Sequence, residues 1–385
     1  MFREIAISVY LFVFRITFFF FCLFPLKQKT TFIVSFNDNL TSVIRSHKKI
    51  VDGQQIITLK SHNCTEKFHD SDKDLYFNIK KPVQFLISIY HIATSTHIII
   101  DNYHGFLSNI KFRSKVTCIQ VWHAAGAIKK FGLEDNSNKS RSKKAISRFK
   151  LVYDKFDHIV VGSNSMAEIF KKSFNVTSKP FLYTGFPRTD FFFNKTEINQ
   201  AKNKFRQKFP TIKGKKIILY APTYRDNELN SMELQINLDN MYNKLHEEYL
   251  LFLRLHPVVA TNFKNTYDDF IFDFSNYENI NDLLVWADIL ITDYSSIPFE
   301  FALLKKPIIF YMYDYHDYNQ SRGIIKEVLH QLPGPISYDT DELISLIQNE
   351  QFKMKKIEEF NSEWSKYSNG HSSDALIHSL FHNIF

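Results

Sequence analysis

The chain has 385 residues, 44% of them hydrophobic and 23% charged, which is the composition of a globular protein long enough for two domains with separate cores. The formal net charge of +8 favours anionic partners such as a nucleotide, a nucleic acid or a membrane surface. Only 10 glycines are present and G-x-G-x-x-G is absent, which excludes a glycine-rich phosphate loop and leaves helix ends and Arg, Lys and His side chains to bind phosphate.

The N-terminal stretch from Met1 to Leu26 is almost entirely apolar and is followed at once by Lys27 and Lys29. No small-residue cleavage site precedes this basic flank, which argues against a removed signal peptide. The stretch is just long enough to span a bilayer, but Arg15 near its centre would cost roughly 2.5–3.5 kcal/mol on insertion scales. On a helix, the polar residues fall on one narrow stripe, made of Glu4, Ser8, Arg15 and Cys22. We therefore predict a membrane-associating segment at 1–28 that lies in the interface, and the weaker alternative is a helix buried against the protein's own core.

From residue 31 onward, strand patterns alternate with helix patterns, which is typical of a parallel sheet wrapped by helices. In the first half the predicted strands are 31–36, 55–59, 96–100, 116–121 and 158–162, and the predicted helices are 82–93 and 140–153. The charged segment 194–214 is a candidate linker with one helix. The second series of predicted strands is 216–221, 250–255, 271–272, 289–292 and 307–310.

This pattern predicts an α/β protein with two Rossmann-like domains that face each other across a cleft. The expected domains are an N-terminal Rossmann-like domain at 29–200 and a C-terminal Rossmann-like domain at 201–385. The last helix is a candidate to return to the N-terminal domain.

One strand–turn–helix segment has the features of a phosphate site. The run 289–292 is short, apolar and β-branched, as expected of a buried parallel strand. Asp293 then begins a turn, Ser295 or Ser296 is placed to cap a helix, and Pro298 fits the first helical turn. Free backbone N–H groups at such a helix start lie at the carboxyl edge of the sheet, where α/β proteins bind phosphates. The alternative is an ordinary strand–helix junction.

Two histidines follow predicted strands, one in each half of the chain. His123 comes just after strand 116–121, and His256 comes just after strand 250–255. Because the pKa of histidine is near neutrality, either side chain can take a proton from a hydroxyl at cytosolic pH. A lone histidine is more often satisfied by the backbone, but one at the strand end of each half is a pattern that favours a shared site.

Four arginines lie in or beside further strand-end segments, and they are Arg188, Arg225, Arg254 and Arg322. Guanidinium forks match phosphate oxygens, so these side chains are candidate clamps for a diphosphate, while a surface ion pair is the alternative for any one of them. The helix 140–153 is strongly basic; a solvated face is its commoner role, and contact with anionic lipid is the more specific one.

The chain resembles the CDP-glycerol glycerophosphotransferase family of wall teichoic acid synthesis. The matching pieces are spread in the family's order over about two thirds of the chain, and they are Trp122-His123 with Lys129-Lys130, Gly185-x-Pro187-Arg188-x-Asp190, Ala221 to Arg225, Leu255-His256-Pro257, Asp288 to Glu300, and Arg322-Gly323. Its length and short apolar N-terminus are most similar to the family's priming enzymes. One departure is Ala124, where many relatives have glycine; Gly126 is expected to allow the close approach instead.

The resemblance implies the two-Rossmann-domain glycosyltransferase type B arrangement and a phosphoryl transfer. A sugar hydroxyl of an undecaprenyl-diphosphate-linked disaccharide would attack the glycerol-bearing phosphorus of CDP-glycerol, and CMP would leave. By resemblance, the domain at 29–200 binds the acceptor and the domain at 201–385 binds CDP-glycerol. His123 is then the general base, and His256 acts with it in catalysis. The residues implied to bind CDP-glycerol are Gly126, Arg188, Pro222, Thr223, Arg225, Arg254, Asp293, Ser295, Ser296 and Arg322. No metal and no cofactor are expected, because cationic side chains and helix ends would neutralise the phosphates.

Several alternatives remain open at this stage. Within the family, the enzyme could extend an already primed chain or use a ribitol donor. In another class, a glycosyltransferase or epimerase that uses a UDP-sugar shares the architecture. A nucleic-acid partner is not expected, because no binding motif accompanies the basic pI. Three cysteines without C-x-x-C spacing favour a reducing cytosolic setting, so we expect a peripheral protein on the cytoplasmic face of the cell membrane.

Overall fold

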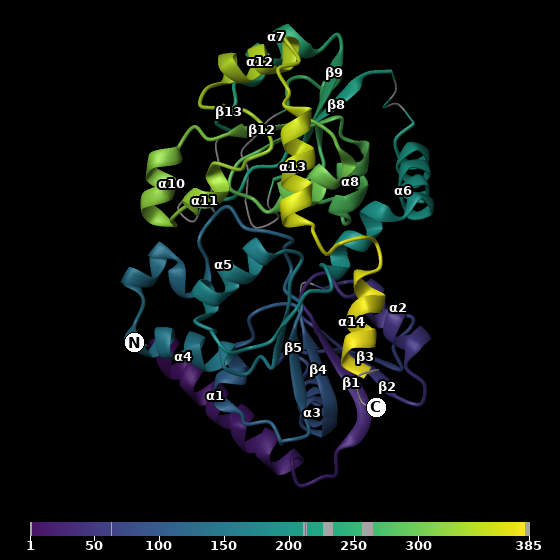
Figure 1. Ribbon diagram of the computed structural model, residues 1–385, viewed down its shortest axis with the longest axis vertical. Coiled ribbons are helices and arrows are strands. Elements are labelled where there is room, and N and C mark those ends of the chain that lie inside the picture. The colour runs from purple at the N-terminus through teal and green to yellow at the C-terminus, as the bar shows by residue number, and fades with distance from the viewer. Residues whose placement is uncertain are drawn as a thin grey trace. The chain divides into compact units, whose positions relative to one another are not determined.

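The computed structural model describes residues 2–62, 64–210, 212, 214–225, 234–255 and 265–381 (Figure 1). The chain forms two compact units. Unit 1 comprises Met1–Ala125, Phe131–Asp190 and Ser365–Phe385, and unit 2 comprises Gly126–Lys130 and Phe191–Trp364. Apart from the short segment Gly126–Lys130, the chain passes from unit 1 to unit 2 at Phe191 and returns to unit 1 at Ser365, and the sequence predicted the boundary after residue 200.

Unit 1 contains a parallel sheet with the strand order β3-β2-β1-β4-β5-β6-β7. Its strands are β1 (Lys27–Val34), β2 (Gln55–Lys60), β3 (Lys73–Tyr76), β4 (Ser95–Ile100), β5 (Thr117–Gln120), β6 (His158–Val160) and β7 (Phe181–Leu182). β1 and β4 are neighbours although the chain visits β2 and β3 between them, so the strand order reverses here. This reversal is the topological switch point, where open α/β sheets bind ligands at the carboxyl ends of their strands.

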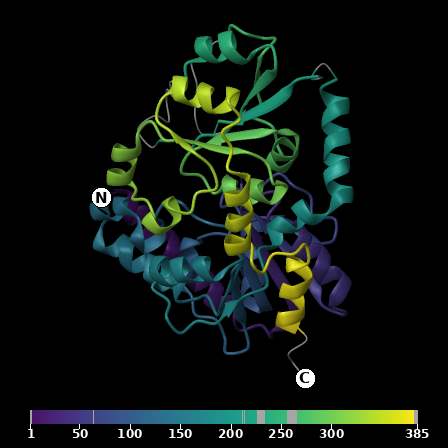
Figure 2. The same cartoon turned by 45° about the horizontal axis from the view of Figure 1, so that its top comes forward.

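Helices cover the unit 1 sheet, and they are α1 (Phe2–Phe21), α2 (Thr41–Ile50), α3 (Pro82–Thr94), α4 (Lys143–Tyr153), α5 (Asn164–Phe174) and α14 (Ser372–Phe381). Unit 1 also contains the 3-10 turns η1 (Gly105–Asn109), η2 (Gly132–Glu134) and η3 (Asn136–Ser140), and the 3-10 turn η4 (Pro187–Phe193) contains the point at which the chain passes to unit 2. Side-chain caps fix two helix starts, because the hydroxyls of Ser142 and Ser163 accept N–H bonds at α4 and α5. The C-terminal helix α14 packs beside α2 (Figures 1 and 2).

Unit 2 contains a second parallel sheet with the order β10-β9-β8-β11-β12-β13. Its strands are β8 (Lys216–Tyr220), β9 (Tyr249–Leu253), β10 (Ile271–Asp273), β11 (Ile289–Thr292), β12 (Ile308–Tyr311) and β13 (Ile336–Ser337). Its helices are α6 (Lys195–Lys208), α7 (Leu238–Leu245), α8 (Ile280–Trp286), α9 (Ile297–Phe301), α10 (Tyr315–Ser321), α11 (Lys326–Leu329), α12 (Thr340–Gln348) and α13 (Met354–Trp364), with the 3-10 turn η6 (Ala302–Leu304). The switch point of this sheet lies between β8 and β11.

The N-terminal helix α1 packs along α3 and η1 on the surface of unit 1. Leu11, Phe14 and Phe18 are buried in this contact, and the Phe14 ring stacks on Phe106 at 4.7 Å. The sequence favoured a helix in the membrane interface over one packed on the protein; the structure shows that one face does pack on the protein. The opposite face is exposed, and it carries Ile5, Val9, Phe12, Val13, Ile16, Phe19 and Phe20.

Candidate functional site

The carboxyl edge of the unit 1 sheet positions His123. Its ring follows β5, and Nδ1 lies 3.0 Å from the backbone oxygen of Asp101, the residue directly after β4. Because a carbonyl oxygen can only accept, this bond places the proton on Nδ1 and the lone pair of the neutral ring on Nε2. A histidine held in this tautomer has the arrangement required of a general base.

Aromatic and basic neighbours surround His123 within unit 1. The rings of Trp122 and Phe36 lie 4.4 and 4.8 Å from the His123 ring. Trp122 has a φ of +58°, in the left-handed region that side chains rarely adopt, and this turns the chain sharply just before the histidine. Arg188 donates to the backbone oxygen of His123 at 2.7 Å and lies 3.8 Å from a carboxylate oxygen of Asp38. The structure therefore brings Arg188, a predicted phosphate clamp, beside the predicted base.

At the switch point of unit 2, Asp293 joins the loops that follow β8 and β11. Its Oδ1 accepts from the backbone N–H of Thr223 at 2.8 Å and from that of Tyr294 at 2.6 Å. Pro222 is buried beside it, and the hydroxyl of Thr223, 8% exposed, has no hydrogen-bond partner within the described residues. A buried hydroxyl without a partner is costly, which makes Thr223 a candidate ligand contact.

Arg225 is engaged by carboxylates rather than presented to solvent. Its Nε and Nη2 donate to the two oxygens of Asp314 at 2.6 and 2.9 Å, and Nη2 also donates to Asp293 at 3.0 Å. Burial acts to lower the pKa of Arg225, but the two carboxylates outweigh burial and raise it. Tyr294 and Tyr318 stack at 3.8 Å, and the guanidinium lies 4.8 Å from the Tyr318 ring. Arg225 and Asp293 therefore hold the loops of this edge in place, and their predicted contacts with CDP-glycerol stay predictions.

The helix predicted after β11 begins as expected but is short. Ser295 Oγ accepts from the N–H of Ile297 at 3.2 Å, whereas Ser296 stands at the capping position without a side-chain bond. Both serines are half-buried. α9 has only 5 residues before it becomes the 3-10 turn η6, so any phosphate here would depend on individual N–H and hydroxyl groups more than on a helix dipole.

The segment Gly126–Lys130 belongs to unit 2 and pairs with the residues after Arg322. Lys130 N–H donates to the oxygen of Gly323, and Ile325 N–H donates to that of Ile128, each at 2.9 Å. A Cβ on Gly126 would lie 2.2 Å from the ring of Phe299 on α9. The sequence expected this glycine to allow a close approach of the ligand, whereas packing against Phe299 accounts for it without one. Arg322 itself is half-buried.

Two predicted site residues remain, Arg254 and His256, and the structure describes only Arg254. Arg254 donates to the backbone oxygens of Phe274 and Ser275, and burial lowers its pKa. His256 lies outside the described residues, and its predicted role stays a prediction. The sequence pattern did not single out Asp101 or Asp314, although Asp101 directly follows the predicted strand 96–100 and Asp314 lies three residues after β12.

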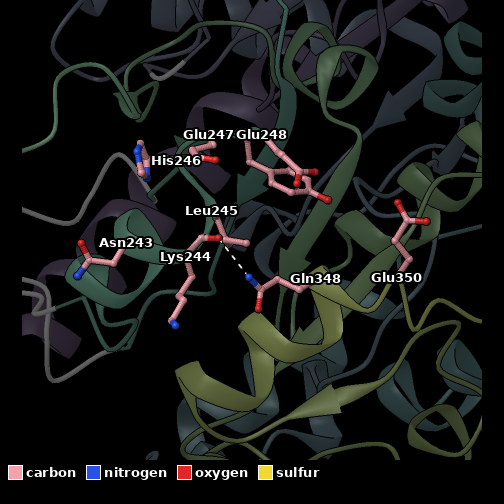
Figure 3. A pocket seen from close by; sticks show the side chains of 9 residues that line it. Asn243, Lys244, Leu245, His246, Glu247, Glu248, Gln348 and Glu350 are labelled. Carbon is pink, nitrogen blue, oxygen red and sulfur yellow. Dashed lines mark hydrogen bonds between the residues drawn. The ribbon is translucent and has the colours of Figure 1, made fainter.

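Unit 2 contains a cavity of about 530 Å³ (Figure 3). It is lined by Asn243, Lys244, Leu245, His246, Glu247, Glu248, Tyr249, Gln348 and Glu350. Since Glu248 directly precedes β9, this cavity lies at the amino edge of the sheet, whereas Thr223 and Asp293 lie at the carboxyl edge. We therefore do not assign it to the candidate site. In the described part of the chain, no group of three His, Cys, Asp or Glu side chains is placed to hold a metal ion.

A family model, two curated relatives and a solved structure all match this chain over most of its length. The family model for CDP-Glycerol:Poly(glycerophosphate) glycerophosphotransferase matches residues 17–382. The teichoic acid glycerol-phosphate primase of Bacillus subtilis (strain 168) is 40% identical over 384 residues, covering 97% of this chain and 97% of the relative. The enzyme of the same name from Bacillus spizizenii (strain ATCC 23059 / NRRL B-14472 / W23) is 36% identical and covers 91% and 92%. A structure of the wall teichoic acid polymerase TagF matches with a TM-score of 0.77 and 24% identity, covering 99% of this chain and 98% of that one, which confirms the α/β fold with two parallel sheets.

Proposed function

Because this chain belongs to the CDP-glycerol:poly(glycerophosphate) glycerophosphotransferase family, we propose that it carries out the priming step of wall teichoic acid synthesis. It transfers glycerol phosphate from CDP-glycerol to a sugar hydroxyl of an undecaprenyl-diphosphate-linked disaccharide. The observation that carries the proposal is the 40% identity to a glycerol-phosphate primase over 97% of both chains. A teichoic acid poly(glycerol phosphate) polymerase of Bacillus spizizenii (strain ATCC 23059 / NRRL B-14472 / W23) is matched over 98% of both chains but is only 28% identical, so the higher identity to the primases favours the priming step over extension of the polymer.

In the proposed reaction, His123 acts as the general base. Its Nε2 lone pair takes the proton of the acceptor hydroxyl while that oxygen forms a bond to the glycerol-bearing phosphorus. The bond between this phosphorus and the bridging oxygen breaks, and the bridging oxygen leaves with CMP. Such a transfer depends on positioning and on neutralising phosphate oxygens more than on covalent catalysis. The Nδ1–H bond to the Asp101 carbonyl supports this role because it leaves Nε2 as the basic nitrogen.

We propose that unit 2 binds the donor at its switch point. Support comes from the buried hydroxyl of Thr223, the half-buried Ser295 and Ser296, and the guanidinium of Arg322. His256 is kept as a donor contact and catalytic partner. We also propose the glycosyltransferase type B arrangement for the two units, on the basis of the paired parallel sheets and the likeness to TagF.

We propose peripheral attachment to the cytoplasmic face of the membrane through α1. The segment Arg3–Phe21 is long and apolar enough to cross a bilayer by length and composition. A spanning helix could not also keep Phe14 and Phe18 packed on unit 1, so the packing supports a helix that lies flat. The exposed face of α3 adds Val83, Leu86 and Ile87, next to α1.

Basic side chains in and just before α4 support the proposal that the membrane surface bound by this protein is anionic. Lys144 and Arg148 donate hydrogen bonds to Ser8 and Glu4 of α1. A basin of about 420 Å³ formed by η3, α4 and the residues between them is lined by Asn138, Arg141, Lys143, Ile146, Ser147 and Lys150. Cations beside an apolar face favour binding to anionic lipid, at about 1 kcal/mol for each Lys or Arg near the surface.

The membrane proposal is tested with Phe19→Glu, which charges a side chain that is 71% exposed and leaves the packed face intact. The variant should float less with vesicles of anionic lipid than the wild type. Tyr338→Glu is the control, because Tyr338 is 55% exposed on unit 2. Equal flotation of Phe19→Glu and wild type would contradict attachment through α1.

The donor proposal is tested by measuring release of the nucleotide product with CDP-glycerol, CDP-ribitol and UDP-N-acetylglucosamine, each with a lipid-linked disaccharide. CMP release with CDP-glycerol, well above the other donors, is the expected result. Preference for CDP-ribitol would assign a ribitol-phosphate transferase, and turnover of the UDP-sugar alone would refute the proposed chemistry.

A further inference from the structure

The Asp101 carboxylate is buried at the switch point of unit 1 and is bonded to backbone. The residue is 0% exposed, and its two oxygens each accept from the N–H of Ser35 at 3.0 Å. The N–H of Phe36 adds a bond of 3.3 Å to Oδ2. Burial raises the pKa of Asp101 to about 6, against these bonds, which lower it. These hydrogen bonds tie the buried carboxylate to the backbone of the loop after β1.

Asp101 is connected to His123 by one direct hydrogen bond and by two indirect contacts through the loop after β1. The backbone oxygen of Asp101 accepts from Nδ1–H of His123, and the carboxylate holds Phe36, whose ring lies 4.8 Å from the His123 ring. The loop that it ties down also carries Asn39, whose amide donates to the backbone oxygen of Trp122 at 2.7 Å. The tautomer, one ring face and the preceding backbone of His123 therefore all depend on the loop after β1 and on Asp101.

Unit 2 uses the same device at its own switch point. Asp293 directly follows β11, as Asp101 directly follows β4, and its carboxylate accepts from Thr223 N–H in the loop after β8. In each unit, an aspartate thus joins the two loops between which the strand order reverses. The repetition at both switch points favours a role in shaping the ligand edge over a general packing role.

We propose that Asp101 is a positioning residue for the general base His123. The inference rests on the proposed function, since it assigns Asp101 to the same proton transfer. Asp101 does not touch the substrate in this proposal. Its carboxylate fixes the loop after β1 so that His123 keeps the orientation in which Nε2 can accept the proton. The equivalent carboxylate in unit 2, Asp293, acts instead on the donor edge.

The test is Asp101→Asn in the full-length protein, which keeps the side-chain shape but turns one accepting oxygen into a donor facing backbone N–H groups. We expect the single-turnover rate of transfer from CDP-glycerol to fall by roughly 10–100-fold, the loss expected when a catalytic group is misplaced by about 1 Å. The affinity for CDP-glycerol, measured by calorimetry, should stay unchanged. The matched control is Asp157→Asn: the carboxylate of Asp157 accepts from Cys118 N–H at 2.8 Å, but at the amino end of β5. This variant should keep the wild-type rate.

A double-mutant cycle separates positioning from a general structural role. If Asp101 acts through His123, then Asp101→Asn should slow the wild type but have no further effect in His123→Asn. Equal slowing in both backgrounds, or a normal rate of Asp101→Asn alone, would overturn the proposal. A normal rate of His123→Asn would refute the general-base assignment, and the positioning role with it. A normal rate of Asp101→Asn together with a slow His123→Asn would refute only the positioning role and leave the proposed function intact.

Discussion

Replacing Arg225 by alanine tests whether the buried network stabilises the carboxyl edge of the unit 2 sheet. The guanidinium is 7% exposed, and its partners Asp293 and Asp314 have side chains that are 2% and 17% exposed. Alanine would leave two largely buried carboxylates without their cation, and breaking a buried ion pair on one side costs about 3–5 kcal/mol. For a domain of 150–250 residues, each kcal/mol lowers the Tm by roughly 2–4 °C, so we expect a loss of roughly 6–20 °C for unit 2.

Scanning calorimetry of the full-length protein measures this loss. The control is Lys216→Ala, which removes the exposed ion pair of Lys216 with Glu350 at 3.0 Å in the same unit. An exposed pair contributes about 0–1 kcal/mol, so the control should shift the Tm little. If Arg225→Ala shifts the Tm no more than Lys216→Ala does, the network does not stabilise this edge and our interpretation of Arg225 is wrong.

Three further predictions concern other parts of the molecule. Burial lowers the pKa of Lys29 to about 7 in the folded protein. Between about pH 7 and the ordinary pKa of lysine, the unfolded chain therefore binds one more proton than the folded chain, and the free energy of unfolding rises with pH. Lys29→Met should lose this rise in urea unfolding measured at several pH values, and an unchanged pH dependence would contradict the prediction. Gly126→Ala should destabilise unit 2 by about 1–3 kcal/mol because the added Cβ would overlap the ring of Phe299. Gly105→Ala is the control, because its Cβ would have no neighbour nearer than 3.8 Å, and equal urea midpoints for the two variants would refute the packing argument. Arg322→Ala should weaken CDP-glycerol binding in calorimetry by roughly 1.5–3 kcal/mol, and unchanged affinity in a folded variant would remove Arg322 from the donor site.

The sequence predicted the central strands because apolar, β-branched runs that are buried on both faces have few other interpretations. The run 289–292 is β11 as predicted. β1 begins at Lys27 and not at residue 31, because Lys29 and Thr30 are buried in the strand by hydrogen bonds to side chains, and their polarity hid the strand from the pattern. The edge strands β3, β7 and β13 were missed because two to four residues carry no usable period.

The candidate site follows from the same pattern. Residues that directly follow apolar strands can be located in the sequence, which is how His123, Thr223 and Ser295 were proposed, and their roles stay predictions. The pattern does not say which partners a side chain has in the fold. It therefore could not show that Arg225 is bound by two carboxylates, or that Asp101 holds backbone N–H groups from the loop after β1.

The central claim is the transfer of a single glycerol phosphate to the lipid-linked disaccharide, with His123 as the base. The most direct measurement is mass analysis of the lipid product formed from CDP-glycerol by the wild type and by His123→Asn. We predict that the wild type adds one glycerol phosphate per acceptor, and that His123→Asn forms this product roughly 10²–10⁴-fold more slowly, as expected for loss of a general base, while it still binds CDP-glycerol. A ladder of products with many glycerol phosphates, or a normal rate of product formation by His123→Asn, would contradict the claim.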